Sequence, residues 1–212
     1  INAVRGASGG GSQNAALKQG GSTPTVVSCT EEYNGSTWSQ GGALNVARLN
    51  NRTNIGTQNS GIMAGGVTPS TVGCVEQYDG SAWAVGTALT IARTTMGGAG
   101  GCNTDAVIFG GRISPSYVNP VEEFDGTTWA VGATMPETVG DGMSGGTSSD
   151  GFMAGGLNPP SSTCNATQEW NKAFIQPFSC YLPGAWGAGG ALITARRSLG
   201  GAGTQNAALA FA

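Results

Sequence analysis

The sequence contains an eight-residue motif that returns at nearly constant spacing. Residues 31–38 read EEYNGSTW, residues 76–83 read EQYDGSAW and residues 122–129 read EEFDGTTW. The aromatic residues at the third position of the motif, together with Trp170, follow one another at intervals of 45, 46 and 46 residues: Tyr33, Tyr78, Phe124 and Trp170. A fixed period of this length is the signature of a repeat architecture with one supersecondary unit per repeat. We therefore expect an array of small units.

Two further landmarks keep this period. Pairs of glycines close apolar runs at 20–21, 65–66, 110–111 and 155–156. Arginine closes three related strings, ALNVAR, ALTIAR and ALITAR, at Arg48, Arg93 and Arg196. These landmarks divide the single array into four full units and the opening part of a fifth, with approximate bounds 5–47, 48–92, 93–137, 138–195 and 196–212.

Each unit is expected to be a small antiparallel sheet. The chain has 38 Gly and no apolar pattern of helical period, and glycine disfavours helix by about 1 kcal/mol at each interior position. Four strands can be placed in a unit of about 45 residues: a Gly-rich strand, an apolar strand that ends at the glycine pair, a strand that ends in the aromatic residue, and a strand that carries tryptophan (Trp38, Trp83, Trp129 and Trp186).

The last two strands are expected to form a hairpin. Asn34-Gly35, Asp79-Gly80 and Asp125-Gly126 are typical of two-residue type I′ turns, which would pair Tyr33 with Ser36 and Glu31 with Trp38. Alternation along the strands then places Tyr33 and Trp38 on one face. A lone sheet of this size cannot bury such a face, so the units are expected to stack on one another.

This pattern resembles the kelch repeats that form β-propeller blades. The resemblance rests on the glycine pairs followed by the aromatic residue and the tryptophan, although four residues separate these two here where kelch blades usually have about six. The strings TEEYNGSTW, LNVAR and GTQNAALAF are similar to kelch-like arrays in virion structural proteins, often tail-fibre or appendage proteins, of marine and cyanobacterial phages. The resemblance implies an all-β, kelch-like propeller of four-stranded antiparallel blades.

The fifth unit has only its first two strands. A closed propeller normally completes its last blade with strands from the opposite end, and no spare pair is present at the start. We therefore expect either an array that continues past residue 212 or strands supplied by another chain; four closed blades with a trailing hairpin are a third alternative.

The charged residues narrow the possible functions. There are 9 Lys and Arg against 12 Asp and Glu, and the basic residues are scattered, which argues against nucleic-acid binding. No run of 18 apolar residues is present, which argues against membrane insertion. The absence of histidine excludes Ser-His-Asp and Cys-His catalysis and His-ligated metals. We expect no enzyme activity and no cofactor, although a glycosidase that uses carboxylates from Asp105, Asp141 and Asp150 remains an alternative.

Residues that recur in every unit are expected to be scaffold, and residues found in one unit are candidates for function. On this rule the recurring aromatic residues are scaffold, and Arg48, Arg93 and Arg196 bridge blades by pairing with carboxylates such as Glu31, Glu76 and Glu122 or by covering a Trp ring. The adjacent pairs Glu31-Glu32 and Glu122-Glu123 point to opposite faces of a strand and cannot converge on a substrate.

The five cysteines are expected to be small apolar fillers. Cys29, Cys74 and Cys164 share one repeat phase, and equivalent positions on neighbouring blades are too far apart for a disulfide. No CxxC motif occurs, which disfavours zinc. The pairing that could be tested is Cys164 with Cys180.

The fourth unit departs from the others between Trp170 and Trp186. The insertion carries Phe174, Phe178 and Tyr181, which could contact another subunit or a sugar face; a loop packed on itself at a sheet edge is the alternative. The loops after the glycine pairs (22–28, 67–73, 112–120 and 157–163) are rich in Ser, Thr and Asn, with Tyr117 as their aromatic residue, and suit weak multivalent glycan binding.

The resemblance to virion proteins implies, and the other features are consistent with, a non-enzymatic virion structural protein, a tail fibre, appendage or capsid-associated fibre, that is located on the virion or outside the cell. Its expected partners are other virion proteins, further copies of itself, and a host-surface glycan or receptor. A bacterial extracellular filament or adhesin, and a polysaccharide-degrading propeller enzyme, are the alternative functions.

Overall fold

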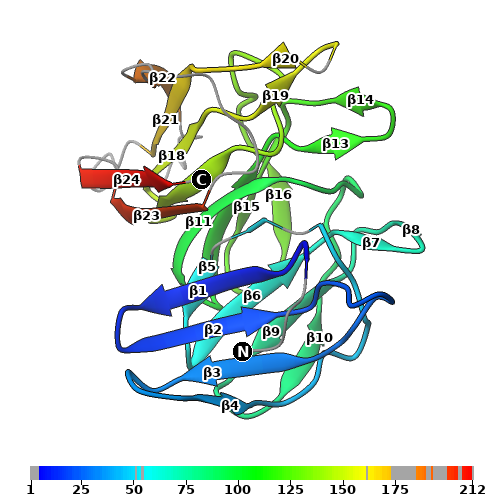
Figure 1. The fold of residues 1–212 in the computed structure, drawn as a ribbon. Helices are drawn as coiled ribbons and strands as arrows, with labels where there is room; N and C mark the ends of the chain where they lie inside the picture. Colours follow the sequence, from blue (N-terminus) through cyan, green and yellow to red (C-terminus); the bar gives the residue numbers. More distant parts are fainter. Residues whose placement is uncertain are drawn as a thin grey trace.

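The protein is an all-β molecule in which four small antiparallel sheets form a four-blade β-propeller (Figure 1). The computed structural model describes residues 5–50, 52–53, 55–160, 162–172, 185–189, 192, 200–204 and 207–211. These described residues contain no helix, and so no helix long and apolar enough to cross a membrane.

Each blade has four strands, numbered from the inner strand outward. Blade 1 contains β1 (Ser8–Ser12), β2 (Ala15–Gln19), β3 (Thr30–Tyr33) and β4 (Trp38–Gln40). Blade 2 contains β5 (Ile55–Thr57), β6 (Ser60–Ala64), β9 (Val75–Tyr78) and β10 (Trp83–Gly86). Blade 3 contains β11 (Gly97–Cys102), β12 (Asp105–Phe109), β15 (Val121–Phe124) and β16 (Trp129–Val131). Blade 4 contains β17 (Met143–Gly146), β18 (Asp150–Ala154), β21 (Thr167–Asn171) and β22 (Ala185–Gly189).

The remaining strands form two-residue hairpins and the start of a fifth unit. The hairpins follow the glycine pairs: β7 (Val67–Thr68) with β8 (Ser70–Thr71), β13 (Arg112–Ile113) with β14 (Ser116–Tyr117), and β19 (Leu157–Asn158) with β20 (Ser162–Thr163). In Figure 1, β7–β8 and β13–β14 project at the right, and β19–β20 lies at the top. The fifth unit contributes β23 (Gly200–Thr204) and β24 (Ala207–Phe211), with β23 next to β17. The strands of each four-stranded sheet fall inside one sequence unit.

The register of the aromatic hairpin differs from the expectation. Tyr33 lies opposite Trp38, not Ser36, because the connection has four residues where the type I′ turn would have two. The side chain of Asn34 accepts hydrogen bonds from the backbone N–H groups of Ser36 and Thr37, which closes an Asx turn. The two rings still share one face, with their centroids 5.2 Å apart.

The same turn recurs in blades 2 and 3 with aspartate in place of asparagine. Asp79 and Asp125 each accept two backbone N–H groups, and these hydrogen bonds lower the pKa of both carboxyl groups. The aromatic pairs are again directly opposite each other, as Tyr78 with Trp83 and Phe124 with Trp129. In blade 4, Trp170 lies opposite Trp186 across the insertion.

The aromatic faces of blades 2 and 3 pack against the preceding blade. Trp83 donates its ring N–H to Thr30 of blade 1 at 2.9 Å, and the hydroxyl of Tyr78 hydrogen-bonds to Glu32 of the same blade. Trp83 and Trp129 are only 6% and 5% exposed. In blade 1 the corresponding Tyr33 and Trp38 are half-buried. Stacking of one sheet on the next therefore buries the aromatic faces of blades 2 and 3.

Close approach of the inner strands accounts for their glycines. A Cβ added to Gly98 on β11 would lie 2.9 Å from the Cδ1 of Ile55 on β5, so a larger residue would push the two blades apart. The Gly-rich first strand of each unit thus permits the blades to converge.

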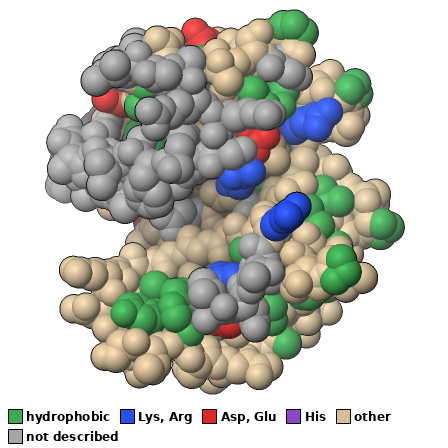
Figure 2. Space-filling model, viewed as in Figure 1, with side chains coloured by type: hydrophobic (Ala, Val, Ile, Leu, Met, Phe, Trp, Pro, Cys, Tyr) green, Lys and Arg blue, Asp and Glu red, His purple; other side chains and the backbone are tan. Residues whose placement is uncertain are grey.

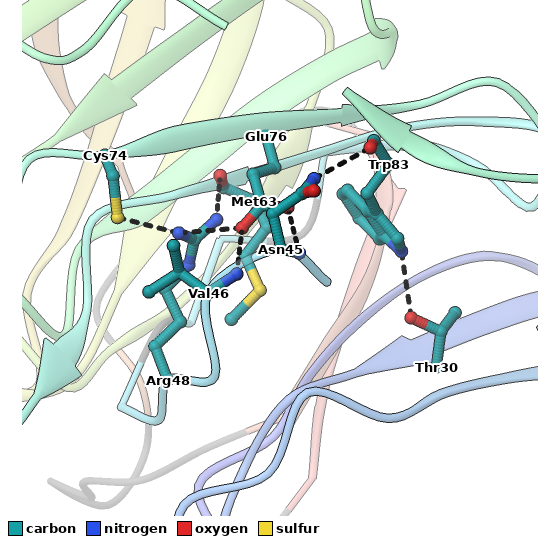
Figure 3. A network of polar contacts seen from close by, with 8 residues as sticks. All are labelled: Thr30, Asn45, Val46, Arg48, Met63, Cys74, Glu76 and Trp83. Carbon is teal, nitrogen blue, oxygen red and sulfur yellow. Dashed lines mark hydrogen bonds and ion pairs between the residues drawn. The ribbon is translucent and has the colours of Figure 1, made fainter. Parts of the chain in front are cut away.

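A buried ion pair anchors the segment between blades 1 and 2 (Figure 3). Arg48 has no exposed side-chain surface and lies 3.1 Å from a carboxylate oxygen of Glu76 on β9. It also donates to the carbonyl oxygen of Met63 at 3.1 Å and contacts the sulfur of Cys74 at 2.7 Å. The carboxylate of Glu76 accepts the backbone N–H groups of residues 45 and 46, so one acidic group holds both the arginine and the chain that carries it.

Blade 3 repeats this arrangement with Arg93 and Glu122, 2.9 Å apart and both buried. Burial lowers the pKa of Arg93, and the nearby carboxylate of Glu122 opposes that shift. In blade 1, Glu31 pairs instead with Lys18 at 2.6 Å. The expected arginine–glutamate pairing is thus present for Arg48 and Arg93, while Arg196 lies outside the described residues.

The four cysteines in the described residues are free thiols: Cys29, Cys74, Cys102 and Cys164. Cys164 is buried, and Cys180, its proposed partner, lies outside the described residues.

Candidate functional site: the axial pocket

The blades are joined at their inner ends by a chain of backbone hydrogen bonds, which we call the inner belt. It consists of four residues that each precede an inner strand: Gly6, Asn50, Thr95 and Asp141. Each of the last three donates its N–H to the carbonyl oxygen of the belt residue before it, at 3.0, 2.8 and 3.0 Å. All four have positive φ, between 53° and 65°. The belt therefore links blades 1 to 4 in order.

A pocket of about 550 Å³ opens beside the inner belt; we call it the axial pocket. The belt contributes Asn50, Thr95 and Asp141, and the small hairpins contribute most of the remaining wall. The full lining is Asn50, Arg52, Val67, Pro69, Ser70, Thr71, Thr94, Thr95, Arg112, Ser114 and Asp141. In the space-filling view, basic side chains lie close together in the middle of the face that is shown (Figure 2). The wall combines hydroxyl groups and charges with the apolar side chains of Val67 and Pro69, and its described residues include no exposed aromatic ring.

An ion pair crosses from the start of blade 2 to the start of blade 4. The Nε of Arg52 lies 2.7 Å from a carboxylate oxygen of Asp141, and both side chains remain partly accessible. The second unit has one residue more than the other units between its belt residue and the first positive-φ glycine of its inner strand. Arg52 lies in this longer segment. The ion pair therefore joins Arg52 and Asp141, two charged residues that each occur in one unit only.

A second arginine enters the pocket from β13 without a carboxylate partner in the described residues. The Nε of Arg112 donates to the carbonyl oxygen of Pro115 at 3.3 Å, and its guanidinium carbon lies 5.7 Å from the ring centroid of Tyr117. A cation held over an aromatic face is attracted to it, so the ring supports and orients this guanidinium. The tyrosine ring therefore holds the remaining N–H donors of the planar Arg112 guanidinium in a defined orientation.

The residues named from the sequence fall into three groups. The recurring aromatic residues of blades 2 and 3, with Trp170, are buried between sheets, where they serve packing. Tyr117 is only 8% exposed and lies beneath Arg112, where its ring supports this guanidinium; the binding role expected of Tyr117 stays a prediction. Phe174, Phe178 and Tyr181 of the insertion lie outside the described residues, and the binding role expected of them stays a prediction.

The three aspartates considered for glycoside hydrolysis do not meet at one cleft. Asp150 begins β18 beyond the turn end of the β17–β18 hairpin, whereas Asp141 lies at the opposite end of that hairpin. Asp105 lies on the turn side with Asp150: the hydroxyl of Ser148 hydrogen-bonds to Asp105, and that of Ser149 donates to Asp150 at 2.7 Å. Only Asp141 lines the axial pocket.

Sequence reasoning identified Asp141 as a residue of a single unit but missed Arg52 and Arg112. The same rule, applied to basic residues, would have found both of them. The positions equivalent to Arg112, directly after the other glycine pairs, are Ser22, Val67 and Leu157. Three charged residues that do not recur, Arg52, Arg112 and Asp141, therefore lie at one pocket, while the recurring Arg48 and Arg93 pair with glutamates inside the scaffold.

Within the described residues, no group of three or more cysteines and acidic residues is close enough to hold a metal ion. The sequence matches no protein family model, and no curated protein matches it. The kelch and phage resemblance therefore rests on the sequence motifs alone.

Proposed function

We propose that the protein is a non-enzymatic structural protein of a virion, a tail fibre, appendage or capsid-associated fibre. In this proposal its kelch-like blades are a stiff scaffold for attachment to a host-surface glycan or receptor and for contacts with other virion proteins or further copies of itself. The protein would act on the virion, outside the host cell.

One observation carries the attachment role: three charged residues that do not recur lie at one open pocket. Arg52, Arg112 and Asp141 come from three different units and line the same pocket. The recurring charges Arg48 and Arg93 are instead buried against glutamates. A repeat protein that holds its scaffold constant and varies one site is typical of a binding module.

The virion assignment is supported by the strings TEEYNGSTW, LNVAR and GTQNAALAF. Tight stacking of blades also suits a protein exposed to proteases, because strands paired on both sides open only when neighbouring packing is lost. A stiff scaffold further keeps a binding site in a constant orientation on a particle.

Immunogold labelling tests the assignment directly. Antibodies raised against residues 1–212 should decorate an appendage or a fibre on virus particles from the native source in negative-stain images. Gold particles on filaments attached to bacterial cells would instead support the extracellular filament or adhesin and overturn the virion assignment.

The enzymatic alternative has its own test. Purified protein should release no reducing sugar from host polysaccharide over a long incubation. Hydrolysis that is lost in both Asp141→Asn and Asp150→Asn variants would contradict the proposal, since these residues lie at opposite ends of one hairpin and a scaffold requires neither as a catalyst.

A further inference from the structure

We propose that the axial pocket binds an acidic sugar that carries a single carboxylate, such as a hexuronic acid residue, with the guanidinium of Arg112 on the carboxylate. This inference rests on the proposed function, for which it names the class of ligand. Its basis is the chemistry of the pocket wall and the way in which two of its three charges are already paired.

One cationic side chain of the pocket is available to a ligand. The pocket contains two arginines and one aspartate, and the aspartate is bound to Arg52 at 2.7 Å. Arg112 is therefore the cation that remains for an incoming anion. A planar guanidinium matches a carboxylate with two parallel hydrogen bonds, and Arg112 is already oriented by Tyr117 and by Pro115.

The charge balance of the pocket favours a ligand with one negative charge. Asp141 lies in the same pocket and would repel a doubly charged group such as a phosphate monoester or a second carboxylate. One free guanidinium can neutralise one negative charge but not two. A ligand with a single carboxylate fits this balance.

The remaining wall of the pocket suits a ligand with several hydroxyl groups. The hydroxyl groups of Ser70, Thr71 and Ser114 line the pocket beside Arg112 and can both donate and accept hydrogen bonds. Asp141 is an acceptor for ligand hydroxyls. No exposed aromatic ring lines the described wall, which disfavours a nucleobase. A polyhydroxylated ring with one carboxylate can use all of these groups.

Binding of defined sugars to the full chain tests the proposal. The probes are methyl β-D-glucuronide, the neutral methyl β-D-glucoside, acetate and inorganic sulfate, with binding followed by chemical-shift changes of backbone amides. We expect saturable binding of the glucuronide, with shifts at pocket residues, and markedly weaker binding of the other three probes. Equal binding of the glucoside, or no saturable binding of the glucuronide, would overturn the proposal. Acetate or sulfate binding as tightly as the glucuronide would reduce the pocket to a simple anion site and would also overturn it.

Two variants and a control assign the interaction to residues. Arg112→Gln should weaken glucuronide binding by about tenfold or more, because it removes a charge-assisted pair. Arg5→Gln removes an exposed arginine that does not line the pocket and should leave binding unchanged. An equal loss in both variants would show non-specific attraction and contradict the site.

Asp141→Asn is informative even if Arg112→Gln fails to fold. Asparagine tolerates the φ of +61° at this position better than most residues, so the belt is preserved. Loss of the negative charge should tighten glucuronide binding several-fold and should improve sulfate binding even more. Weaker binding of both anions would contradict the charge balance proposed for the pocket. These measurements use purified protein, so a failure here leaves the immunogold result standing, and a failure of the virion assignment leaves the pocket chemistry standing.

Discussion

At the scale of single residues, the inner belt combines an unusual backbone conformation with a position beside the axial pocket. Its positive-φ positions hold the chain where it enters each inner strand, and three of the four are not glycine. Positive φ costs the most conformational free energy at Thr95, because its side chain is β-branched and its φ is 53°. Its hydroxyl oxygen is also buried without a hydrogen-bond partner. Strain of this kind next to a pocket is maintained by the surrounding packing.

Thr95→Gly should therefore stabilise the protein by about 1 kcal/mol. The change relieves left-handed strain of about 1–2 kcal/mol and removes an unpaired hydroxyl, and the greater flexibility of glycine in the unfolded chain offsets roughly 0.5–1 kcal/mol of that gain. Urea denaturation monitored by tryptophan fluorescence measures the difference in free energy of unfolding.

The adjacent residue provides the control. Thr94 donates its hydroxyl to the carbonyl oxygen of Asn50 at 2.6 Å and is not among the positive-φ residues. Thr94→Gly should lower the free energy of unfolding by about 1 kcal/mol or more, because a hydrogen bond is lost and no strain is relieved. Changes of the same sign in both variants would contradict the account of Thr95.

The phenol of Tyr78 should ionise at a higher pH than an ordinary tyrosine, and its ionisation should destabilise the folded protein. Burial, together with the hydrogen bond to Glu32, raises the pKa of Tyr78 from 10.0 to about 12. Because the folded-state pKa is the higher one, the stabilising contribution is complete below pH 10 and is lost as the pH rises through 12. Absorbance at 295 nm should show a late-titrating phenol that is missing in Tyr78→Phe. Ionisation of all tyrosines near pH 10 in the folded protein would contradict this expectation.

At the scale of structural elements, the glycine pairs join each blade to the segment that begins the next. Both residues of every pair have positive φ, near 62–65° and 102–106°. The N–H of Gly66 donates to the carbonyl oxygen of Arg93 at 3.1 Å, and Gly21 and Gly111 make the equivalent bonds to Arg48 and Val139. The recurrence of these pairs in the sequence thus reflects a backbone contact made at the end of each second strand.

Gly65→Ala should be strongly destabilising, by about 2–4 kcal/mol. The new Cβ would lie 2.5 Å from the carbonyl oxygen of Arg93, a backbone atom that cannot easily move, and alanine disfavours the φ of +65°. Gly101→Ala is the matched control, because its Cβ would meet nothing within 4 Å, and it should be neutral or slightly stabilising. Equal midpoints in thermal unfolding for the two variants would be inconsistent with this explanation.

At the scale of the whole molecule, stability comes from sheets that bury each other's faces. The cluster between blades 1 and 2 contains Leu17, Leu44, Met63, Tyr78 and Trp83, and comparable clusters lie between blades 2 and 3 and between blades 3 and 4. Blade 1 differs because its aromatic pair, Tyr33 and Trp38, is half-buried. Equivalent residues of the repeat therefore contribute unequally to stability, because neighbouring blades cover them to different extents.

Substitution of two equivalent tryptophans should reveal this inequality. Trp83→Ala removes a ring that is 6% exposed and donates to Thr30, and should cost about 3–5 kcal/mol. Trp38→Ala removes a half-buried ring and should cost about 1–2 kcal/mol. Chemical denaturation gives both values, and acrylamide should quench Trp38 more readily than Trp83. Equal costs would mean that a neighbour covers the first blade as fully as the second.

The period of the motif was sufficient to predict blades, their strands and their stacking, because an aromatic face on a sheet of this size cannot be buried within one unit. It did not predict the turn after Tyr33, since Asn-Gly suits a type I′ turn and an Asx turn alike, and the side chain of Asn34 selects the longer loop. The axial pocket required the tertiary structure. Arg52, Arg112 and Asp141 belong to three different units, and only the curvature set by packing between blades brings them to one wall. Local patterns carry no information about that curvature, because it arises from contacts between residues that are distant in the chain.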